Sequence, residues 1–366
     1  MKALIAMSGG VDSSVAALRM LEAGWDCLGC TMKLYQNEDA GLSASRTCCA
    51  LEDVEDARGA ACRLGIPHYV FNFTEDFRRE VIGRFAAAYM AGRTPNPCID
   101  CNRFLKFGRL DRRARELGCD VLVTGHYARI VEEQGRWYLK KALDETKDRS
   151  YFLYRMSQAQ LARTRFPLGE LTKPEVRAMA EARGLLNARK PDSQDICFVP
   201  DGDYARVIES CTGITPEPGD FLDEAGRVLG RHKGIIHYTV GQRRGLGLGL
   251  ERPWYVLRIE PERNAVILGP KSALYTKTAF TEGFHWICGT PPAGPIRCAA
   301  KIRYRHPEQP CLLTPLPNGG VRLDFDEAQR AVTPGQSAVV YDGDTVLGGG
   351  ELSSLSHSNQ EEIEHA

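Results

Sequence analysis

The chain has 366 residues, a length that predicts two or three domains rather than one. Hydrophobic residues make up 43% of it and charged residues 26%, so the chain can bury a sizeable core. Lysine plus arginine equals aspartate plus glutamate, at 47 each. The bulk charge therefore predicts no polyanionic partner, and any nucleic-acid surface must come from local clusters.

The first part of the chain alternates strand-like and helix-like stretches. Short apolar runs typical of buried parallel strands lie at 2–7, 26–34, 67–73 and 119–125. Helical spacing covers 13–24, 50–64, 75–91 and 103–117, and a further short helix is expected in 171–185. This alternation predicts an α/β fold with a doubly wound, mainly parallel sheet over residues 1–208.

Beyond about residue 210 the pattern changes to glycine, proline and short alternating runs. The runs lie at 234–240, 254–260, 264–269, 297–305, 321–325 and 337–341. We predict a small central β-rich domain at 209–275, a C-terminal β-barrel at 276–358 and a disordered tail at 359–366. The N-terminus has no signal-peptide pattern, and no stretch approaches the ~20 apolar residues of a membrane helix. We therefore expect a cytoplasmic protein that makes no contact with a membrane.

A glycine loop, "SGGVDSS" at 8–14, follows the first predicted strand and precedes the first helix. Such a turn lets backbone N–H groups approach phosphate oxygens, and the helix N-terminus favours their charge. The serines add hydroxyl donors. Asp12 would repel phosphates unless a cation lay between them, which predicts a Mg²⁺ bridge. The loop is neither a Walker A motif nor a dinucleotide fingerprint.

This loop resembles that of the ATP-pyrophosphatase superfamily, whose members split ATP between its α and β phosphates. Six further blocks follow in order: 94–108, 124–129, 147–154, 190–198, 238–247 and 303–306. Together they resemble the bacterial tRNA-specific 2-thiouridylase family from residue 1 to about 355. The resemblance implies an adenine nucleotide alpha hydrolase-like fold and an enzyme that replaces the C2 oxygen of wobble uridine 34 with sulfur.

The resemblance also implies roles for particular residues. The ATP-binding positions are Ala6, Met7, Ser8, Gly9, Gly10, Val11, Asp12, Ser13, Met32 and Gly125. Cys101 falls on the catalytic cysteine and Cys197 on the cysteine that carries sulfur as a persulfide. Asn96, Pro97 and Cys98 fall where the family touches the base, and Lys147, Asp148, Arg149, Arg303 and Tyr304 fall on tRNA-contacting stretches.

The chemistry accounts for both cysteines. Adenylating the C2 oxygen makes AMP a leaving group, and a persulfide on Cys197 can then attack C2 as a soft nucleophile. Cys101 would release the sulfur through a Cys101–Cys197 disulfide or by cutting the S–S bond. A disulfide requires Cα atoms within ~7 Å, and 96 positions separate the two residues in sequence. The family implies a persulfide-carrying protein as the sulfur donor.

Cys98 leaves alternatives open, because relatives often carry aspartate at this position. Cys98, Cys101 and Cys197 could instead hold a [4Fe-4S] cluster that delivers sulfide from its open iron. A Cys98–Cys101 disulfide is disfavoured in a reducing compartment, and a zinc site would need four ligands. Cys48 and Cys49 receive no assignment. The chain has thirteen cysteines in all. Among the others, we predict that Cys27, Cys30, Cys62 and Cys119 are buried as small hydrophobes.

Basic residues gather in three places despite the neutral total. They are Arg103, Lys106, Arg109, Arg112, Arg113 and Arg115; Arg231, Lys233, Arg243 and Arg244; and Lys301, Arg303, Arg305 and His306. Each cluster alone is typical of a solvated face, but three of them beside an ATP loop favour RNA. Phe104, Leu105 and Phe107 are predicted in the core, and His126 and His237 as structural or ligand-positioning residues.

Two other functions remain as alternatives to a tRNA sulfurtransferase. One is an ATP-pyrophosphatase that amidates a small molecule, although the chain carries no glutaminase signature. The other is a non-catalytic RNA-binding protein with an inactive nucleotide loop, which the intact loop and both cysteines disfavour. Release of pyrophosphate from ATP, with and without tRNA, distinguishes the three.

Overall fold

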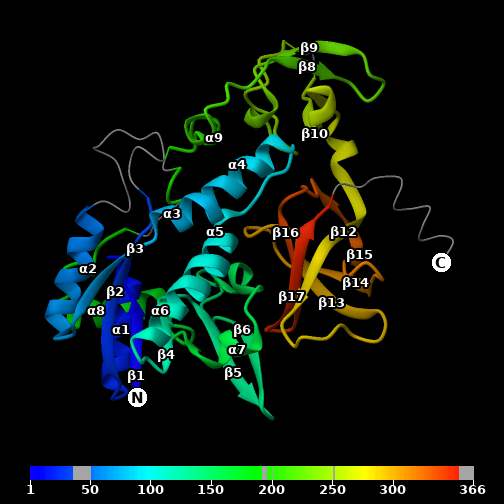
Figure 1. The fold of residues 1–366 in the computed structure, drawn as a ribbon. Coiled ribbons are helices and arrows are strands. Elements are labelled where there is room, and N and C mark those ends of the chain that lie inside the picture. The colour runs from blue at the N-terminus through cyan, green and yellow to red at the C-terminus, as the bar shows by residue number, and fades with distance from the viewer. Residues whose placement is uncertain (36–50, 192–195, 200, 250–251, 354–366) are drawn as a thin grey trace.

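The computed structural model describes residues 1–35, 51–191, 196–199, 201–249 and 252–353 (Figure 1). Cys48, Cys49 and the predicted tail at 359–366 lie outside these residues. Within them, no helix is long and apolar enough to cross a membrane.

The N-terminal layer is a five-stranded parallel sheet. Its order is β3 (His68–Asn72), β2 (Asp26–Lys33), β1 (Lys2–Ala6), β4 (Val121–Thr124) and β7 (Thr164–Arg165). The chain leaves β1 toward β2 on one side, and β4 pairs with β1 on the other. The order therefore reverses between β1 and β4, and such a switch point is where open α/β sheets bind ligands.

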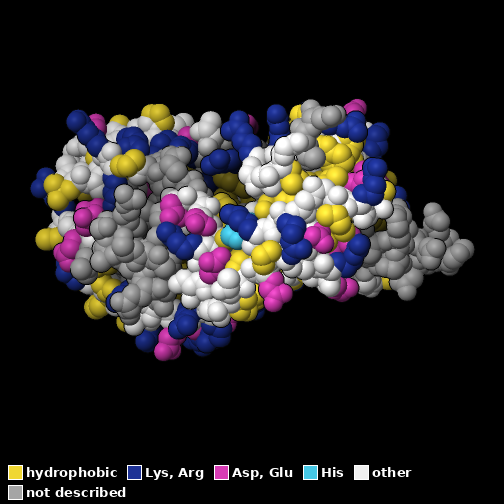
Figure 2. All heavy atoms as spheres, turned by 90° about the horizontal axis from the view of Figure 1, so that it is seen from above, with side chains coloured by type: hydrophobic (Ala, Val, Ile, Leu, Met, Phe, Trp, Pro, Cys, Tyr) yellow, Lys and Arg dark blue, Asp and Glu magenta, His cyan; other side chains and the backbone are white. Residues whose placement is uncertain are grey.

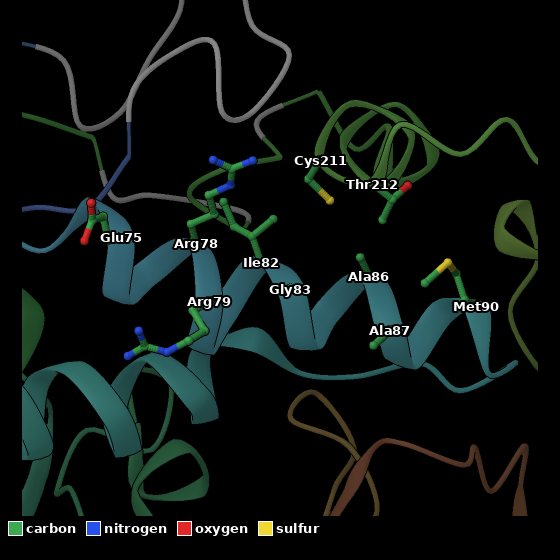
Figure 3. Close-up of a pocket in the computed structure, with 10 residues that line it drawn as sticks. All are labelled: Glu75, Arg78, Arg79, Ile82, Gly83, Ala86, Ala87, Met90, Cys211 and Thr212. Carbon is green, nitrogen blue, oxygen red and sulfur yellow. The ribbon is translucent and has the colours of Figure 1, made fainter.

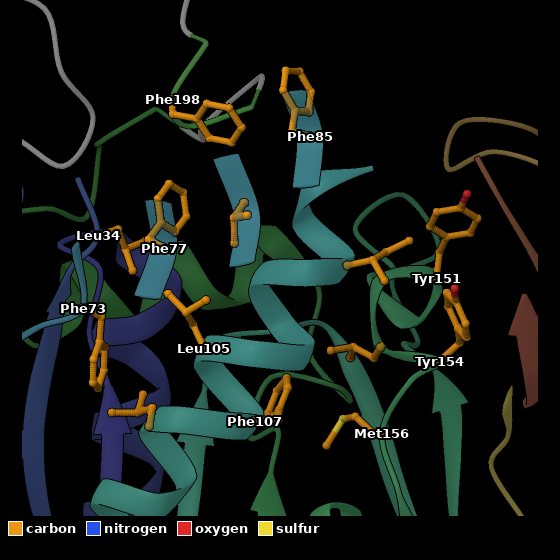
Figure 4. Packing of buried hydrophobic residues seen from close by; sticks show 14 of the residues in the cluster. Leu34, Phe73, Phe77, Phe85, Leu105, Phe107, Tyr151, Tyr154, Met156 and Phe198 are labelled. Carbon is orange, nitrogen blue, oxygen red and sulfur yellow. The ribbon is translucent and has the colours of Figure 1, made fainter. Parts of the chain in front are cut away.

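Helices cover both faces of this sheet. One face carries α1 (Val11–Glu22), α2 (Leu51–Leu64) and α8 (Lys173–Ala182), which share a core with Ala3 and Ile5 of β1. The other carries α3 (Thr74–Phe77), η2 (Arg78–Ile82), α4 (Gly83–Met90), α5 (Pro97–Asp100), η3 (Cys101–Leu110) and α6 (Asp111–Glu116). Leu4 of β1 points into that second core, which is rich in aromatic rings (Figure 4).

The predicted helix at 171–185 is confirmed as α8. Thr172 and Glu175 form a capping box, and Pro174 lies in the first turn, where it removes no hydrogen bond. Short helices α7 (Gln158–Ala162) and α9 (Tyr204–Thr212) complete this part of the chain.

The central part is a small four-stranded sheet. Its order is β10 (Tyr255–Glu260), β11 (Ala265–Gly269), β8 (Gly219–Leu222) and β9 (Val228–His232). The strand predicted at 234–240 is wrong, because Ile235–His237 is a 3₁₀ turn between Gly234 and Gly241, both with positive φ. Ile236 and Tyr238 are both buried, and this alternation is what imitates a strand.

The C-terminal part is a closed six-stranded antiparallel barrel. Its order is β12 (Tyr275–Trp286), β15 (Val321–Arg330), β14 (Gln309–Pro315), β13 (Ile296–Lys301), β16 (Ser337–Asp342) and β17 (Thr345–Leu352), and β12 pairs with β17 to close it. The predicted fold class, a parallel α/β layer followed by β-rich and barrel parts, is confirmed.

Two connections join the barrel to the N-terminal layer. The hairpin of β5 (Ala128–Glu133) and β6 (Arg136–Lys141) pairs with β17 through Lys140 and Thr345. Thr94, just before α5, donates its N–H to Pro334 O at 2.8 Å and accepts from Gln336 Nε2 at 2.8 Å. The barrel thus fixes the chain that leads into the first of the two cysteines at 98 and 101.

Candidate active site

The glycine loop lies between β1 and α1, at the carboxyl end of the central strand. Gly10 is the N-cap of α1, so the first free N–H groups of this helix face the loop. Ser13 Oγ accepts from Ser8 N at 3.1 Å and donates to Gly10 O at 2.9 Å. Ser14 Oγ also donates to Gly10 O. Both hydroxyls therefore shape the loop itself in this state.

Two glycines allow close backbone contacts around this loop. Gly9 has a φ of +77°, and a Cβ there would overlap Asp53 O of α2. Gly125 follows β4 across the switch point, and a Cβ there would lie 2.9 Å from the backbone N of Ser13. The predicted ATP-site position Gly125 is thus brought against the loop, with no space for a side chain between them.

Asp12 accepts two hydrogen bonds that sequence reasoning missed. Lys173 Nζ lies 2.7 Å from Asp12 Oδ1, and Tyr127 Oη donates to the same oxygen at 2.9 Å. The Lys173 side chain is 8% exposed, so its ammonium is held inside the protein beside the loop. Lys173 is the first residue of α8. The sequence predicted this helix, but it did not indicate that Lys173 contacts Asp12.

Asn187 supports the loop from a third side. Its Nδ2 donates to Gly9 O and to Ser14 Oγ, each at 2.9 Å. Its Oδ1 is buried and has no hydrogen-bond partner among the described residues. A buried acceptor without a donor is costly unless a ligand or water satisfies it. The glycine contacts and this orphan oxygen fit a nucleotide with hydroxyl or amine donors.

The cysteine stretch at 96–101 is a helix start. Asn96 is the N-cap of α5, its side chain accepts from Cys98 N at 3.2 Å, and Pro97 occupies the first turn. Cys98 is exposed, whereas Cys101 is half-buried one turn later. Burial raises the pKa of the Cys101 thiol to about 11, and the Lys106 ammonium acts in the opposite direction. Cys101 is therefore a neutral thiol at pH 7 in this state.

Residues 101–110 form a π-helix, which sequence reasoning read as an ordinary helix. A π-helix bonds residue i to residue i+5, so side chains five apart share a face. This register puts Lys106 on the face of Cys101, which an α-helix would not do. Lys106 Nζ also lies 3.5 Å from His126 Nε2, and Thr124 Oγ1 lies 2.7 Å from His126 Nδ1. Burial lowers the pKa of His126, so a neutral ring faces the ammonium. The structural or ligand-positioning role expected for His126 stays a prediction.

We expect Gly108→Ala to destabilise the protein, because its Cβ would lie 3.0 Å from Arg103 O within the π-helix. The expected loss is about 1–2 kcal/mol in free energy of unfolding, the effect of an overpacked site. Gly59→Ala in α2 is the control, since among the described residues its Cβ meets only Leu186 Cδ1, at 3.9 Å. It should stabilise by about 0.5–1 kcal/mol, as in an ordinary helix. Urea unfolding of both variants checks this, and equal stabilisation would mean that the π-helix does not require Gly108.

Cys197 is a half-buried cysteine at the edge of the aromatic core. Tyr35 Oη donates to Cys197 O at 2.6 Å, and Phe198 packs edge-on against Phe77 and Phe85. Tyr35 lies two residues beyond the carboxyl end of β2, so this segment lies at the same edge of the sheet as the glycine loop. Met32 is near the carboxyl end of β2 and therefore lies at the same edge of the sheet.

Cys101 lies toward that edge too, because α6 leads into the amino end of β4 and the helix runs antiparallel to the strands. The fold therefore directs the loop, Cys101 and Cys197 to one edge. No disulfide links Cys101 and Cys197 here. Among the described residues no three His, Cys, Asp or Glu side chains form a group that could hold a metal ion, so the three-cysteine arrangement is not assembled in this state.

Tyr304, in the connection between β13 and β14, lies against aromatic and basic side chains of the N-terminal layer. Arg149 Nη1 donates to Tyr304 Oη at 2.7 Å, and the Phe152 and Tyr304 ring centroids are 4.3 Å apart. Asp148 is buried and accepts from Ser150 Oγ at 2.7 Å and from two backbone amides. Asp148 is therefore a structural residue here, whereas Arg149 and Tyr304 form a joined platform.

The predicted basic clusters are partly neutralised. Arg109 pairs with Asp76, Arg113 with Glu116 and Arg115 with Asp111. Arg303 donates to Arg330 O at 3.0 Å and is half-buried. Figure 2 shows Lys and Arg side chains spread over the upper face with Asp and Glu among them.

Leu105 and Phe107 are in the core as predicted, while Phe104 is half-buried under the guanidinium groups of Arg84 and Arg103.

The prediction that four further cysteines are buried holds for Cys27, Cys30 and Cys119 but is wrong for Cys62. Cys62 lies on the outer face of α2, where helical spacing exposes it.

A cavity of about 360 Å³ lies between η2, α4 and α9 and includes Cys211 and Arg78 (Figure 3). Its lining contains neither candidate cysteine and no loop residue, so it is not the nucleotide site.

Three family profiles match the chain in order. The tRNA methyl transferase HUP domain matches residues 1–201, the tRNA methyl transferase PRC-barrel domain 211–270, and the Aminomethyltransferase beta-barrel domain 276–352. The tRNA-specific 2-thiouridylase MnmA of Moorella thermoacetica is 49% identical over 354 residues, which cover 96% of this chain and 99% of that protein. The same-named protein of Acetivibrio thermocellus is 48% identical and covers 95% and 98%.

A parallel sheet with a glycine loop at its switch point and two barrel-type appendages defines a nucleotide-binding enzyme of the HUP class. Identity near one half over almost the whole length places the chain more narrowly. It belongs to the tRNA-specific 2-thiouridylase family.

Proposed function

We propose that this chain is an ATP-dependent tRNA sulfurtransferase that converts the wobble uridine 34 of tRNA to 2-thiouridine. The observation that carries the proposal is the shared sheet edge of the glycine loop, Cys101 and Cys197. A loop that fits a nucleotide and two cysteines at the same sheet edge suit a reaction in which ATP activates an oxygen and sulfur replaces it. Near-full-length relatives named 2-thiouridylases support the same reaction.

In the first step the uridine C2 oxygen attacks the α-phosphate of ATP, and pyrophosphate leaves. The amides of the loop from Gly9 to Ser13 would hold the phosphates at the N-terminus of α1. Asp12 would hold Mg²⁺, which supplies charge neutralisation beside the phosphates. Lys173 neutralises Asp12 in this structure, and it can turn its ammonium to a phosphate once the cation is bound.

In the second step the terminal sulfur of a persulfide on Cys197 attacks C2, and AMP leaves with the former oxygen. In one route Cys101 then attacks Cys197 Sγ, which forms a Cys101–Cys197 disulfide and leaves the outer sulfur on the base. In the alternative route Cys101 attacks Cys197 Sγ of the persulfide first, which forms the same disulfide and releases sulfide, and the sulfide attacks C2. Either route needs the thiols to approach, and a movement of the helix start at α5 or of the 196–199 segment would provide it. A dithiol reductant would reopen the Cys101–Cys197 disulfide, and a persulfide-carrying protein would then reload the Cys197 thiol.

The proposed tRNA contacts follow from the family resemblance and differ in exposure. Asn96, Pro97 and Cys98 form the helix start that leads to Cys101; Cys98 is exposed and Pro97 is buried, so the base would meet Cys98 first. Arg149 and Tyr304 present an aromatic and cationic platform to RNA, and Lys147 precedes it. Arg303 would need to leave its bond to Arg330 O to reach a phosphate. A tRNA substrate implies that the protein works in the cytoplasm.

The family description "methyl transferase" names a different reaction from that of the curated relatives. Methyl transfer has no use for a loop that splits ATP between its α and β phosphates or for a pair of reactive thiols. These residues favour thiolation. We also propose domain boundaries at about residues 208 and 275, because the pattern of strands changes at both positions.

The test is release of pyrophosphate and AMP from ATP, with and without tRNA, in the presence of a persulfide donor. The proposal expects equal amounts of AMP and 2-thiouridine, strictly dependent on tRNA. Amidation of a small molecule instead of tRNA, or binding of tRNA without ATP cleavage, would replace it by one of the two alternatives. Anaerobic protein without iron or a visible absorbance band, yet active, selects the persulfide over the [4Fe-4S] route.

We expect Cys101 of the free protein to alkylate slowly at pH 7. With a pKa of about 11, only about 10⁻⁴ of it is thiolate at that pH, and the rate should rise about tenfold per pH unit up to pH 10. Cys98, which is exposed on the preceding turn, serves as the internal reference. Iodoacetamide labelling followed by peptide mass spectrometry measures both. If Cys101 is labelled as fast as Cys98 at pH 7, the raised pKa of Cys101 is contradicted.

A further inference from the structure

Two cysteines outside the candidate active site face each other inside the C-terminal barrel. Cys298 on β13 and Cys311 on β14 are directly opposite in the antiparallel register. Their Sγ atoms are 3.7 Å apart, and both are free thiols. The proposed sulfur transfer uses neither of them.

The backbone already has the spacing that a disulfide needs. Directly opposed residues of antiparallel strands have Cα atoms about 4.5–5.5 Å apart. A disulfide accepts Cα separations of about 4.4–6.8 Å and an S–S bond of about 2.05 Å. The sulfurs can therefore close their 3.7 Å separation by side-chain rotation, without a change in strand pairing.

The two thiols differ in access and acidity. Cys311 is fully buried among barrel residues such as Leu313 and Phe325, whereas Cys298 is partly exposed. The hydrogen bond with Cys311 lowers the pKa of Cys298, with help from the Arg297 guanidinium. The same bond and burial raise the pKa of Cys311. The accessible sulfur is thus the more nucleophilic one, and its buried neighbour is within reach.

We propose that Cys298 and Cys311 form a dithiol oxidation site that a peroxide converts to a cross-strand disulfide. The Cys298 thiolate attacks a peroxide oxygen, the O–O bond breaks, and Cys298 becomes a sulfenic acid. The Cys311 thiol then attacks that sulfur, the S–S bond forms, and the sulfenic hydroxyl leaves as water. The two cysteines lose two electrons and two protons, and hydrogen peroxide becomes two waters.

The disulfide would close the hairpin whose connection carries Arg303 and Tyr304. Tyr304 is held by Arg149 and lies against Phe152, so the staple would fix one side of the platform proposed for tRNA. The constraint acts mainly on the unfolded chain, and the barrel should resist heat better after oxidation.

The experiment is peptide mapping of the full-length protein after treatment with hydrogen peroxide. Trypsin cuts after Arg297, Lys301, Arg305 and Arg322, which separates the two cysteines into peptides 298–301 and 306–322. We expect these peptides as a linked pair lacking two hydrogen atoms, abolished by reduction. Oxidation should also raise the melting temperature of the wild type.

Cys311→Ala should stop at the sulfenic acid of Cys298, which dimedone traps, and Cys298→Ala should leave Cys311 reduced. Cys62→Ser, a change at an exposed cysteine of α2, should leave the linked pair intact. The proposal is overturned if Cys298 and Cys311 stay reduced while Cys62 and Cys288 are oxidised, or if Cys298 links to another cysteine. Because the wild-type map needs no variant and no tRNA, its outcome is independent of the sulfur-transfer proposal.

Discussion

Cys197→Ser is expected to abolish 2-thiouridine formation, by more than about 10³-fold, because a hydroxyl cannot carry a persulfide sulfur. Adenylation should continue, since the loop amides, Asp12 and Gly125 are untouched. Tyr35 binds the carbonyl of residue 197, so the segment should keep its position in the variant. The measurement is single-turnover release of pyrophosphate beside mass-spectrometric counting of thiolated tRNA. Pyrophosphate without thiolated tRNA is the predicted result.

The matched control is Cys211→Ser, because Cys211 is also a half-buried thiol but lines the cavity beside α4. That variant should thiolate tRNA within about twofold of the wild type, as surface-type changes generally do. Thiolated tRNA from the Cys197→Ser protein, at more than a trace, would refute delivery by Cys197. Loss of pyrophosphate release as well would mean that Cys197 acts before the sulfur step.

Gly125→Ala should lower ATP cleavage by about 10²-fold or more, the effect expected when a reacting group is displaced by about 1 Å. The new Cβ would lie 2.9 Å from Asp12 C and 2.9 Å from Ser13 N, both backbone atoms that cannot rotate away. The loop must therefore shift from its place at the end of β1. Nucleotide affinity by calorimetry and pyrophosphate release with tRNA measure this effect.

Gly294→Ala controls for the loss of a glycine, because no atom of the described residues lies within 4 Å of its Cβ position and its φ is not in the left-handed region. It should retain wild-type ATP cleavage. Circular dichroism of Gly125→Ala separates a displaced loop from an unfolded chain. A folded Gly125→Ala protein with normal nucleotide affinity would mean that the loop after β4 has no part in the ATP site.

The sequence allowed the fold class and the nucleotide loop to be predicted, because both depend on local patterns. Apolar runs of strand length alternate with helices in 1–125, and "SGGVDSS" has its glycines and aspartate within seven residues. The resemblance placed the cysteines. It could not supply their surroundings, because Tyr35, Phe77 and Phe85 approach Cys197 from distant parts of the chain.

What sequence reasoning missed depends on long-range contacts or on helix type. Lys173 and Tyr127 reach Asp12 from more than 100 positions away, and no spacing rule relates them. The π-helix at 101–110 has the apolar spacing of an α-helix, and only Gly108 hints at the wider turn. The β5–β6 hairpin was not predicted, because its strands carry charged side chains and complete the barrel sheet from another domain.

The most direct test loads Cys197 with a persulfide labelled in its outer sulfur and follows that sulfur in one turnover. With ATP and tRNA, we predict that the label moves to uridine 34 and that one AMP forms per labelled base. Without ATP, the label should stay on the protein. Label in tRNA without ATP, or unlabelled 2-thiouridine formed while Cys197 keeps its sulfur, would contradict the account.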